Sequence, residues 1–133
     1  ADYGLKLPAS NGKLAVGGFC WGGGQTFRYA TNRSGLKAAY VFYGSGITDP
    51  VAIAKIAAPV YGFYAENDAR INASIPDVEA EMKAAGKTYE PKIYEGGGHG
   101  FMRADEDPTG SEGNKKARAA AWDRWKRLLQ GLM

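Results

Sequence analysis

The 133-residue sequence contains a single cysteine, Cys20, and a single histidine, His99. One cysteine excludes a disulfide framework within the chain. Without cysteine or histidine neighbours in the sequence, it also argues against a zinc site. Any chemistry that needs an imidazole must use His99. These low counts narrow the search for a functional site to very few residues.

The sequence also lacks a strong charge of either sign and lacks long apolar runs. The net charge of +3 is too small to indicate a nucleic-acid partner, and the basic residues between 115 and 127 fit a solvated helix face. No apolar run approaches the roughly 20 residues that span a bilayer. Residues 1–7 lack the basic start and apolar block of a secretory signal. We therefore expect no membrane partner and a cytoplasmic location.

Glycine is present in excess, at 19 of 133 positions, against a usual share of about 7%. It clusters in 17–24 and 96–100, so the cause must be local. The run Gly22-Gly23-Gly24 is not followed by the Lys-Ser/Thr pair of a phosphate-binding loop, and the cluster does not fit G-x-G-x-x-G with an acidic partner. The glycines therefore do not indicate a nucleotide cofactor.

Apolar runs alternate with helical periodicities along the chain. Strands are predicted over residues 14–19, 37–43, 59–64 and 89–95. Helices are predicted over residues 22–31, 76–86 and 114–130, with loops at 96–100 and 104–113. This alternation is typical of an α/β fold: a mostly parallel sheet of about four strands with flanking helices. The length fits a single domain over residues 1–133.

The segment Gly18-Phe19-Cys20-Trp21-Gly22 has the form G-x-C-x-G. It is the cysteine version of the G-x-S-x-G nucleophile elbow, a sharp turn between a strand and a helix. We expect the two glycines to leave space that a Cβ would fill. The turn would raise the sulfur above the sheet and position the N–H of Trp21 to donate to an oxyanion.

Cys20, Asp68 and His99 each come just after a predicted strand, where the working residues of parallel sheets gather. The order nucleophile, acid, histidine is that of hydrolases with this elbow and differs from the chymotrypsin order. Asp68 would hold the imidazole in one tautomer, and His99 would exchange protons with the thiol and the leaving group. Glu66 remains a rival for the acid.

Four stretches of the sequence together resemble the dienelactone hydrolase family of the α/β-hydrolase fold. They are NGKLAVGGFCWGGG (11–24), VFYG (41–44), GFYAEND (62–68) and YEGGGHGF (94–101). The resemblance implies hydrolysis of a small carboxylic ester or lactone by a Cys-Asp-His triad, with no metal or organic cofactor. It also implies a substrate-carboxylate contact for Arg103, four residues after His99, and a place in the pocket for Tyr43.

The resemblance covers the C-terminal half of such a domain. Family members carry earlier strands, a loop that supplies a second oxyanion N–H, a glutamate that helps to ionise the cysteine and a second substrate arginine. In this chain the strand 14–19 would be an exposed apolar edge, which invites pairing. We therefore expect a homodimer, or association with a missing N-terminal half. The alternative to an enzyme is a non-catalytic or complementation-dependent half-domain that associates through this strand.

Overall fold

The computed structural model describes residues 1–104 and 110–133. Its centre is a four-stranded sheet in the order β1-β2-β3-β4. All three strand pairs are parallel. The strands are β1 (Leu14–Phe19), β2 (Leu36–Phe42), β3 (Val60–Asn67) and β4 (Tyr89–Gly98). The predicted α/β fold with a parallel sheet is confirmed.

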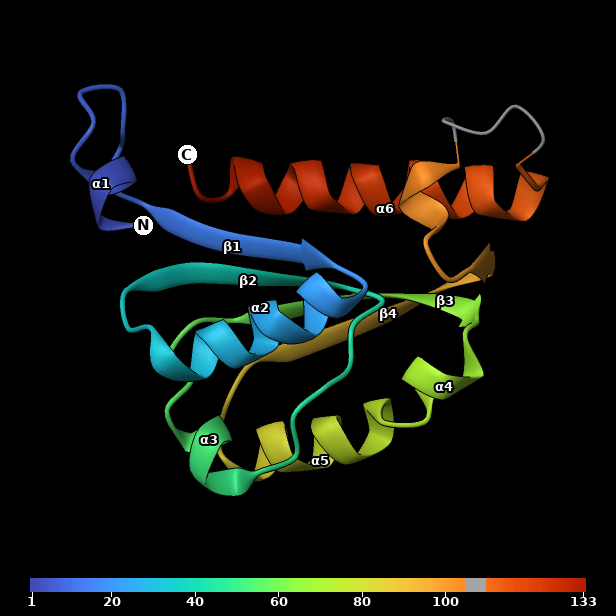
Figure 1. Cartoon of the computed structure of the whole chain (residues 1–133), viewed down its shortest axis with the longest axis horizontal. Helices are drawn as coiled ribbons and strands as arrows, with labels where there is room; N and C mark the ends of the chain where they lie inside the picture. Colours follow the sequence, from blue (N-terminus) through green and yellow to red (C-terminus); the bar gives the residue numbers. More distant parts are fainter. Residues whose placement is uncertain (105–109) are drawn as a thin grey trace.

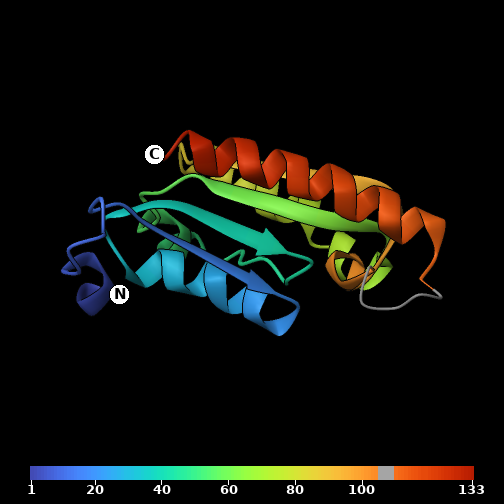
Figure 2. The ribbon, with the colours of Figure 1, turned by 90° about the horizontal axis from the view of Figure 1, so that it is seen from above.

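Helices cover both faces of the sheet and give three layers (Figures 1 and 2). One face carries α6 (Glu112–Gln130), and the opposite face carries α2 (Trp21–Asn32), α3 (Pro50–Ala54) and α5 (Ile75–Ala84). The short elements are α1 (Asp2–Leu5), α4 (Ala69–Asn72) and the 3-10 turn η1 (Phe101–Arg103). Part of the predicted loop 104–113 lies outside the described residues, and its end belongs to α6.

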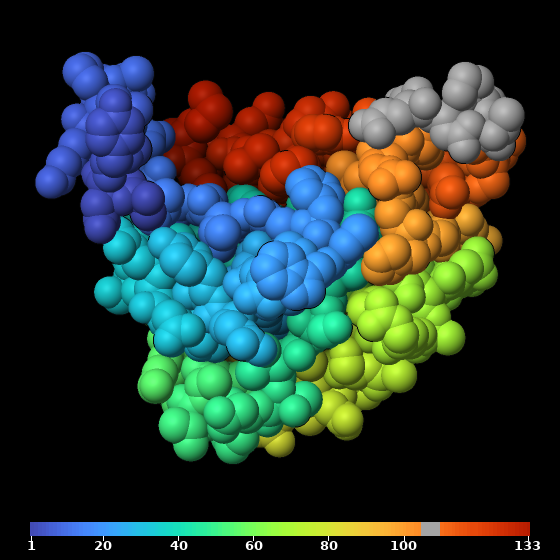
Figure 3. Space-filling view, viewed as in Figure 1, coloured from blue at the N-terminus to red at the C-terminus, as the bar shows by residue number. Residues whose placement is uncertain are grey.

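The inner strands are buried on both faces, which explains why β2 reads as a continuous apolar run. Ala39 and Val41 of β2 pack under α2, α3 and α5, whereas Tyr40 and Phe42 pack under α6. The first dozen residues stand out at one corner of the molecule (Figure 3). No helix among the described residues has the length and apolar character needed to cross a membrane.

One aromatic side chain from each strand forms a row across the face under α6. Phe19 stacks on Phe42 with ring centroids 4.5 Å apart, and Phe42 stacks on Phe63 at 4.3 Å. Phe63 lies parallel to Tyr94 at 6.2 Å. Trp125 of α6 meets Phe42 edge-on at 4.8 Å. Offset stacked and edge-on pairs add to the free energy gained from burial alone.

The end of α5 shows how local sequence sets an element boundary. Gly86 has a φ of 68°, in the left-handed region. The N–H of Lys87 donates to the carbonyl of Met82 at 2.8 Å, and the N–H of Gly86 donates to Lys83 at 3.0 Å. This pair of bonds is the Schellman motif that glycine favours. The predicted helix end at Gly86 is confirmed.

Two predicted boundaries were wrong. β3 continues to Asn67 rather than ending at residue 64, and β4 continues to Gly98, so residues 96–98 are strand rather than loop. Asn67 pairs with Gly98, beyond a register irregularity between Ala65 and Asn67. The extra pairing brings both strand ends to one edge of the sheet, where the candidate site lies. Polar and glycine residues hid this extension because they break the apolar pattern.

Pro91 lies within β4, which is an edge strand, and this is where proline is tolerated in a sheet. Proline has no N–H to donate. The guanidinium of Arg124 on α6 reaches this place and donates to the carbonyls of Gly62 and Glu90, both at 2.7 Å. The helix therefore ties the β3–β4 pair together beside the proline.

Candidate active site

Cys20 lies at the turn between β1 and α2, with a φ of 55° and a ψ of −124°. This conformation is rare for a residue with a side chain and is held here by its surroundings. The N–H of Cys20 donates to the carbonyl of Phe42 at 3.1 Å, and its carbonyl accepts from Gly23 at 3.0 Å. The side chain is exposed. Trp21 begins α2, so its N–H has no acceptor within the helix.

Close backbone packing supports this turn. A Cβ on Gly18 would lie 2.2 Å from the carbonyl oxygen of Gly22, and one on Gly23 would lie 2.7 Å from that of Phe42. A Cβ on Gly22 would meet no described atom within 4 Å. The expected need for glycine therefore holds at Gly18 and is wrong for Gly22. The second position that requires glycine is Gly23, because this residue of α2 approaches the end of β2.

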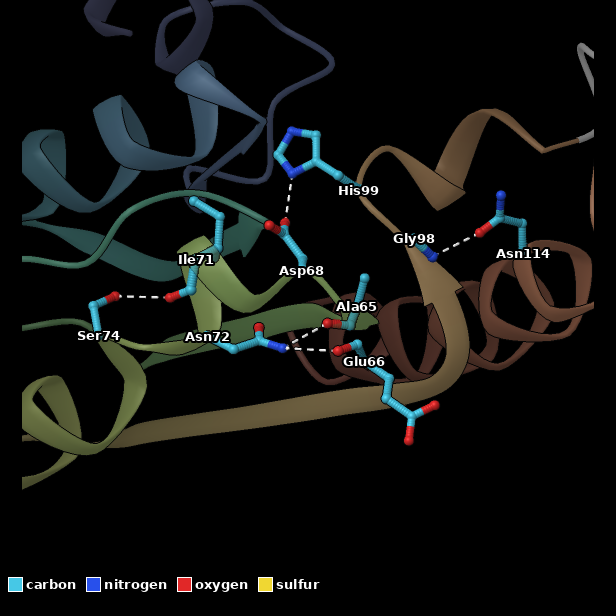
Figure 4. A network of polar contacts seen from close by, with 9 residues as sticks. All are labelled: Ala65, Glu66, Asp68, Ile71, Asn72, Ser74, Gly98, His99 and Asn114. Carbon is cyan, nitrogen blue, oxygen red and sulfur yellow. Dashed lines mark hydrogen bonds and ion pairs between the residues drawn. The ribbon is translucent and has the colours of Figure 1, made fainter.

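Asp68 and His99 form the central contact of the site. Oδ2 of Asp68 lies 2.5 Å from Nδ1 of His99 (Figure 4). The Asp68 side chain is 7% exposed and that of His99 is 39% exposed. The carboxylate is therefore withdrawn behind the imidazole, and the far ring nitrogen points away from it (Figure 4). An aspartate in this place holds one tautomer and one orientation of the ring.

Two asparagines that sequence reasoning missed hold the acid and the histidine in place. The Asn72 amide on α4 donates to the carbonyl of Ala65 at 2.7 Å and braces the turn that carries Asp68. Oδ1 of Asn114, in the first turn of α6, accepts from the N–H of Gly98 at 2.7 Å, directly before His99 (Figure 4). A polar residue at the start of an amphipathic helix gave a weak signal for the second contact.

Glu66, the rival acid, makes a different contact. Its carboxylate accepts from the N–H of Gly96 at 2.8 Å. Gly96 has a φ of 71°, in the left-handed region. Glu66 therefore bonds to the backbone near the end of β4, whereas Asp68 bonds to the imidazole.

Two cavities meet at Cys20. The first, of about 390 Å³, is lined among others by Cys20, Trp21, Tyr43 and His99. The second, of about 320 Å³, is lined by Cys20 and Tyr43 together with Phe19, Met102, Arg103 and Trp122. The cysteine and the histidine thus border one space, and the predicted substrate residue Arg103 borders the other.

Tyr43 forms part of the wall between the cavities. It is 1% exposed and has a φ of 36°, a second strained conformation at the site. Its ring centroid lies 5.2 Å from that of His99. Its N–H donates to the carbonyl of Phe63 at 2.8 Å, which fixes the turn after β2. The structure therefore brings Tyr43 to both the cysteine and the histidine.

Arg28 and Arg70 also line the first cavity, and sequence reasoning did not single them out. Arg28 lies seven residues after Trp21 on α2, hence on the same side of the helix. Arg70 lies two residues after Asp68, on α4. Among the described residues, no group of three or more His, Cys, Asp or Glu residues could hold a metal ion.

Comparison with solved structures places the chain among α/β hydrolases. A crystal structure described as a "Putative Dienelactone Hydrolase" from Klebsiella pneumoniae matches with a TM-score of 0.74 and 28% identity, over 89% of this chain and 52% of that one. A dienelactone hydrolase-like promiscuous phosphotriesterase from metagenomic libraries matches with a TM-score of 0.79 at 21% identity, over 96% of this chain and 56% of that one. At this identity the second match shows the fold alone.

Sequence relatives agree with the structural matches. Proteins named "Putative carboxymethylenebutenolidase" from Saccharolobus solfataricus and Escherichia coli are 38% and 34% identical, each over 89% of this chain. The chain spans 44% and 45% of their lengths, less than half of each. The model of the dienelactone hydrolase family matches residues 2–133. The chain, with its elbow, its Asp–His contact and its parallel sheet, belongs to the dienelactone hydrolase family.

Proposed function

We propose that this chain carries the catalytic residues of a carboxylic-ester or lactone hydrolase, with Cys20 as the nucleophile, His99 as the proton carrier and Asp68 as the residue that orients the imidazole. The observation that carries the proposal is the 2.5 Å contact between Asp68 and His99 beside a strained, exposed cysteine. The cysteine and histidine line one cavity. The relatives named "Putative carboxymethylenebutenolidase" support the substrate class.

In the first half of the reaction, Sγ of Cys20 attacks the carbonyl carbon of the ester while His99 takes the thiol proton. The carbonyl oxygen becomes an oxyanion, and the free N–H of Trp21 at the start of α2 donates to it. The intermediate collapses as the bond to the leaving oxygen breaks. His99 gives its proton to that oxygen, and an alcohol leaves behind an acyl-thioester.

In the second half, His99 takes a proton from a water molecule, whose oxygen attacks the thioester carbon. The carbon–sulfur bond breaks, the proton returns to the sulfur, and the carboxylic acid departs. Asp68 stays ionised throughout and stabilises the imidazolium that forms twice in the cycle. No step requires a metal or an organic cofactor. The chemistry suits activated esters and lactones, whose oxygen leaves easily.

Hydrolysis of p-nitrophenyl acetate tests the assignment. We expect Cys20→Ala and His99→Ala to lower kcat/KM by roughly three orders of magnitude, to a common baseline, because residues that act as a unit are not additive. Mass spectrometry should show one acetyl group per chain before turnover ends, and none on Cys20→Ala. Equal rates in the chain and both variants would overturn the proposal and favour a half-domain that needs a further segment for activity.

A matched pair of acids tests the part of Asp68. Asp68→Asn should lower kcat/KM by up to about 10³, towards the baseline of the Cys20 and His99 variants, since the amide favours the wrong tautomer of the ring. Glu66→Gln keeps the contact to Gly96 possible and should cost less than tenfold. The reverse order of effects would assign the acid to Glu66.

A further inference from the structure

We propose that Arg28 and Arg70 form an anion-binding subsite beside Cys20, so that the ester carries an acidic group on the side that enters the cavity lined by both Cys20 and His99. The inference rests on the proposed function for the reaction itself and adds which part of the substrate is recognised, and where. It differs from the subsite implied by the resemblance, because Arg103 borders the other cavity.

The two arginines are exposed residues that line one cavity from different elements. Arg28 lies on the side of α2 that also brings Gly24 and Gln25 to the cavity, and Arg70 comes from α4, next to Ile71. The cavity measures about 390 Å³, which is within the range of small-molecule sites. Its lining includes both Cys20 and His99. An anion held there would therefore be part of the molecule whose carbonyl meets the sulfur.

Among the described residues, the charges that line this cavity are unbalanced. In the described part of the chain, neither the Arg28 nor the Arg70 guanidinium has a hydrogen-bond or ion-pair partner, and only the backbone carbonyl of Arg28 accepts side-chain hydrogen bonds, from Thr31 and Asn32. The described residues that line the cavity include no aspartate or glutamate. Asp68, the nearest acid in sequence, is buried behind His99 and bonded to it. Two unneutralised guanidinium groups in one concave space attract an anion and can bind a carboxylate through paired N–H bonds.

The second cavity has a different character. Phe19, Met102 and Trp122 give it a mainly apolar wall beside Arg103. Because Cys20 lies where the two cavities meet, an ester whose carbonyl lies at the sulfur extends into both. The acidic end then lies with Arg28 and Arg70, and the apolar end lies against the aromatic side chains. The geometry thus divides the substrate into an anionic arm and an apolar arm.

Alkylation of Cys20 tests this subsite without requiring turnover. Iodoacetate and iodoacetamide are nearly the same size, and they differ in charge. The same thiolate attacks the CH2 carbon of both reagents and displaces iodide, so the ratio of their rate constants cancels any effect of an arginine on thiol ionisation. Cys20 is the single thiol of the chain, so the reaction is specific for this site. We expect the ratio of the rate constants for iodoacetate and iodoacetamide to be higher for Cys20 than for N-acetylcysteinamide, a neutral free thiol.

Arg28→Gln and Arg70→Gln should each lower this ratio by about two- to fivefold, the effect of one exposed ion pair, and the double variant by about tenfold. The preference should also weaken as salt is raised, because exposed charges are screened. Arg127→Gln, an exposed arginine on α6 outside both cavities, is the matched control for net charge and should leave the ratio unchanged.

A wild-type ratio in Arg28→Gln, Arg70→Gln and the double variant would overturn the subsite. So would a fall confined to Arg103→Gln, which would assign the anion to the other cavity. Failure of the hydrolase proposal would be seen separately: the chain would not hydrolyse the ester, while the ratio of alkylation rates would still respond to Arg28→Gln and Arg70→Gln.

Discussion

The two edge strands of the sheet differ in composition: β4 resembles the terminal strand of a sheet, whereas β1 resembles an interior strand. β4 carries Glu90, Pro91, Lys92 and Glu95, the charges and proline with which natural edge strands avoid pairing. β1, LAVGGF, has no charge and no proline, and its final side chain, Phe19, is 42% exposed. The comparison teaches that β4 is suited to end a sheet, whereas β1 has the composition of a strand with a partner on each side.

The edges are also held in different ways. β1 is fixed by backbone packed on backbone, at Gly18 against Gly22. β4 is fixed by side chains, through Arg124 and through the hydroxyl contact of Tyr64 with Tyr89 at 2.8 Å. The first kind of contact tolerates no added atom. The second kind can be weakened gradually, by substitution or by pH.

The largest effect should come from a pair of glycines near the two strand ends. Gly18→Ala places a Cβ 2.2 Å from a backbone oxygen and should lower the free energy of unfolding by about 3 kcal/mol or more. Gly98→Ala meets its nearest neighbour, Oδ1 of Asn114, at 3.6 Å and should cost less than about 1 kcal/mol. Urea unfolding measures both. Equal losses would remove the distinction between the edges.

Removing the clamp on β4 should have the next largest effect. Arg124→Ala loses two charge-assisted bonds to strand carbonyls and a guanidinium that lies 4.5 Å from the centre of the Phe63 ring. We expect a loss of about 2–3 kcal/mol in the free energy of unfolding. Arg127→Ala, on the exposed side of the same helix, should change it by less than about 0.5 kcal/mol. A similar result for both arginines would show that the clamp contributes nothing.

Alkaline pH should destabilise the fold through its buried tyrosines, which include Tyr40 of β2 and the Tyr64–Tyr89 pair that joins β3 to β4. Burial raises the pKa of Tyr64 to about 12, and burial also raises the pKa of Tyr89. Below about pH 10 these tyrosines are neutral in both the folded and the unfolded chain, so their contribution to the free energy of unfolding does not change with pH. As pH rises from 10 towards 12 the unfolded state releases protons that the folded state retains, and stability falls by about 1.4 kcal/mol per pH unit for each such tyrosine.

Tyr64→Phe should therefore reduce the steepness of this loss, with a residual slope from the other buried tyrosines. Tyr3→Phe changes a side chain that is 80% exposed and serves as the control. Guanidinium unfolding at a series of pH values measures the slope. An unchanged slope in Tyr64→Phe would contradict the assignment.

The smallest effect should be on association. We expect the chain to self-associate through the β1 edge at micromolar concentrations, because an apolar strand with free N–H and carbonyl groups is a template for pairing. Gly17→Lys puts a charge on the edge strand, on the face where an added Cβ would lie 3.7 Å from the Trp125 ring, and should weaken association by roughly tenfold. Ile93→Lys puts a charge on β4, where Ile93 is 50% exposed, and should change the strength of association little. Analytical ultracentrifugation would contradict the expectation if it showed a monomer at all concentrations.

Short sequence patterns correctly predicted the features that depend on residues close together in the sequence. The apolar runs gave the four strands, Gly86 gave the end of α5, and the G-x-C-x-G turn placed Cys20 between β1 and α2. The strand ends and the order along the chain marked His99 and Asp68, with Glu66 as a rival acid, and the structure adds which acid contacts the ring.

Other features depend on residues that meet across the fold. Asn114 contacts Gly98 from another element, and Arg124 reaches two strands from α6. Arg28 of α2 and Arg70 of α4 line one cavity. No sequence spacing indicates these contacts, because the residues are far apart in the chain. They form only when the helices pack on the sheet in three layers, and a sequence pattern does not predict that packing.

The backbone at Cys20 and Tyr43 has a consequence for how this protein can change. Both residues have positive φ values, 55° and 36°, where a side chain costs about 1–3 kcal/mol relative to relaxed backbone. Glycine at either position would release that energy and make the chain more robust, while removing the thiol or the ring beside it. Resistance to heat and reactivity therefore pull in opposite directions at this turn, and a variant selected for thermostability alone would drift towards a well-folded protein without a nucleophile.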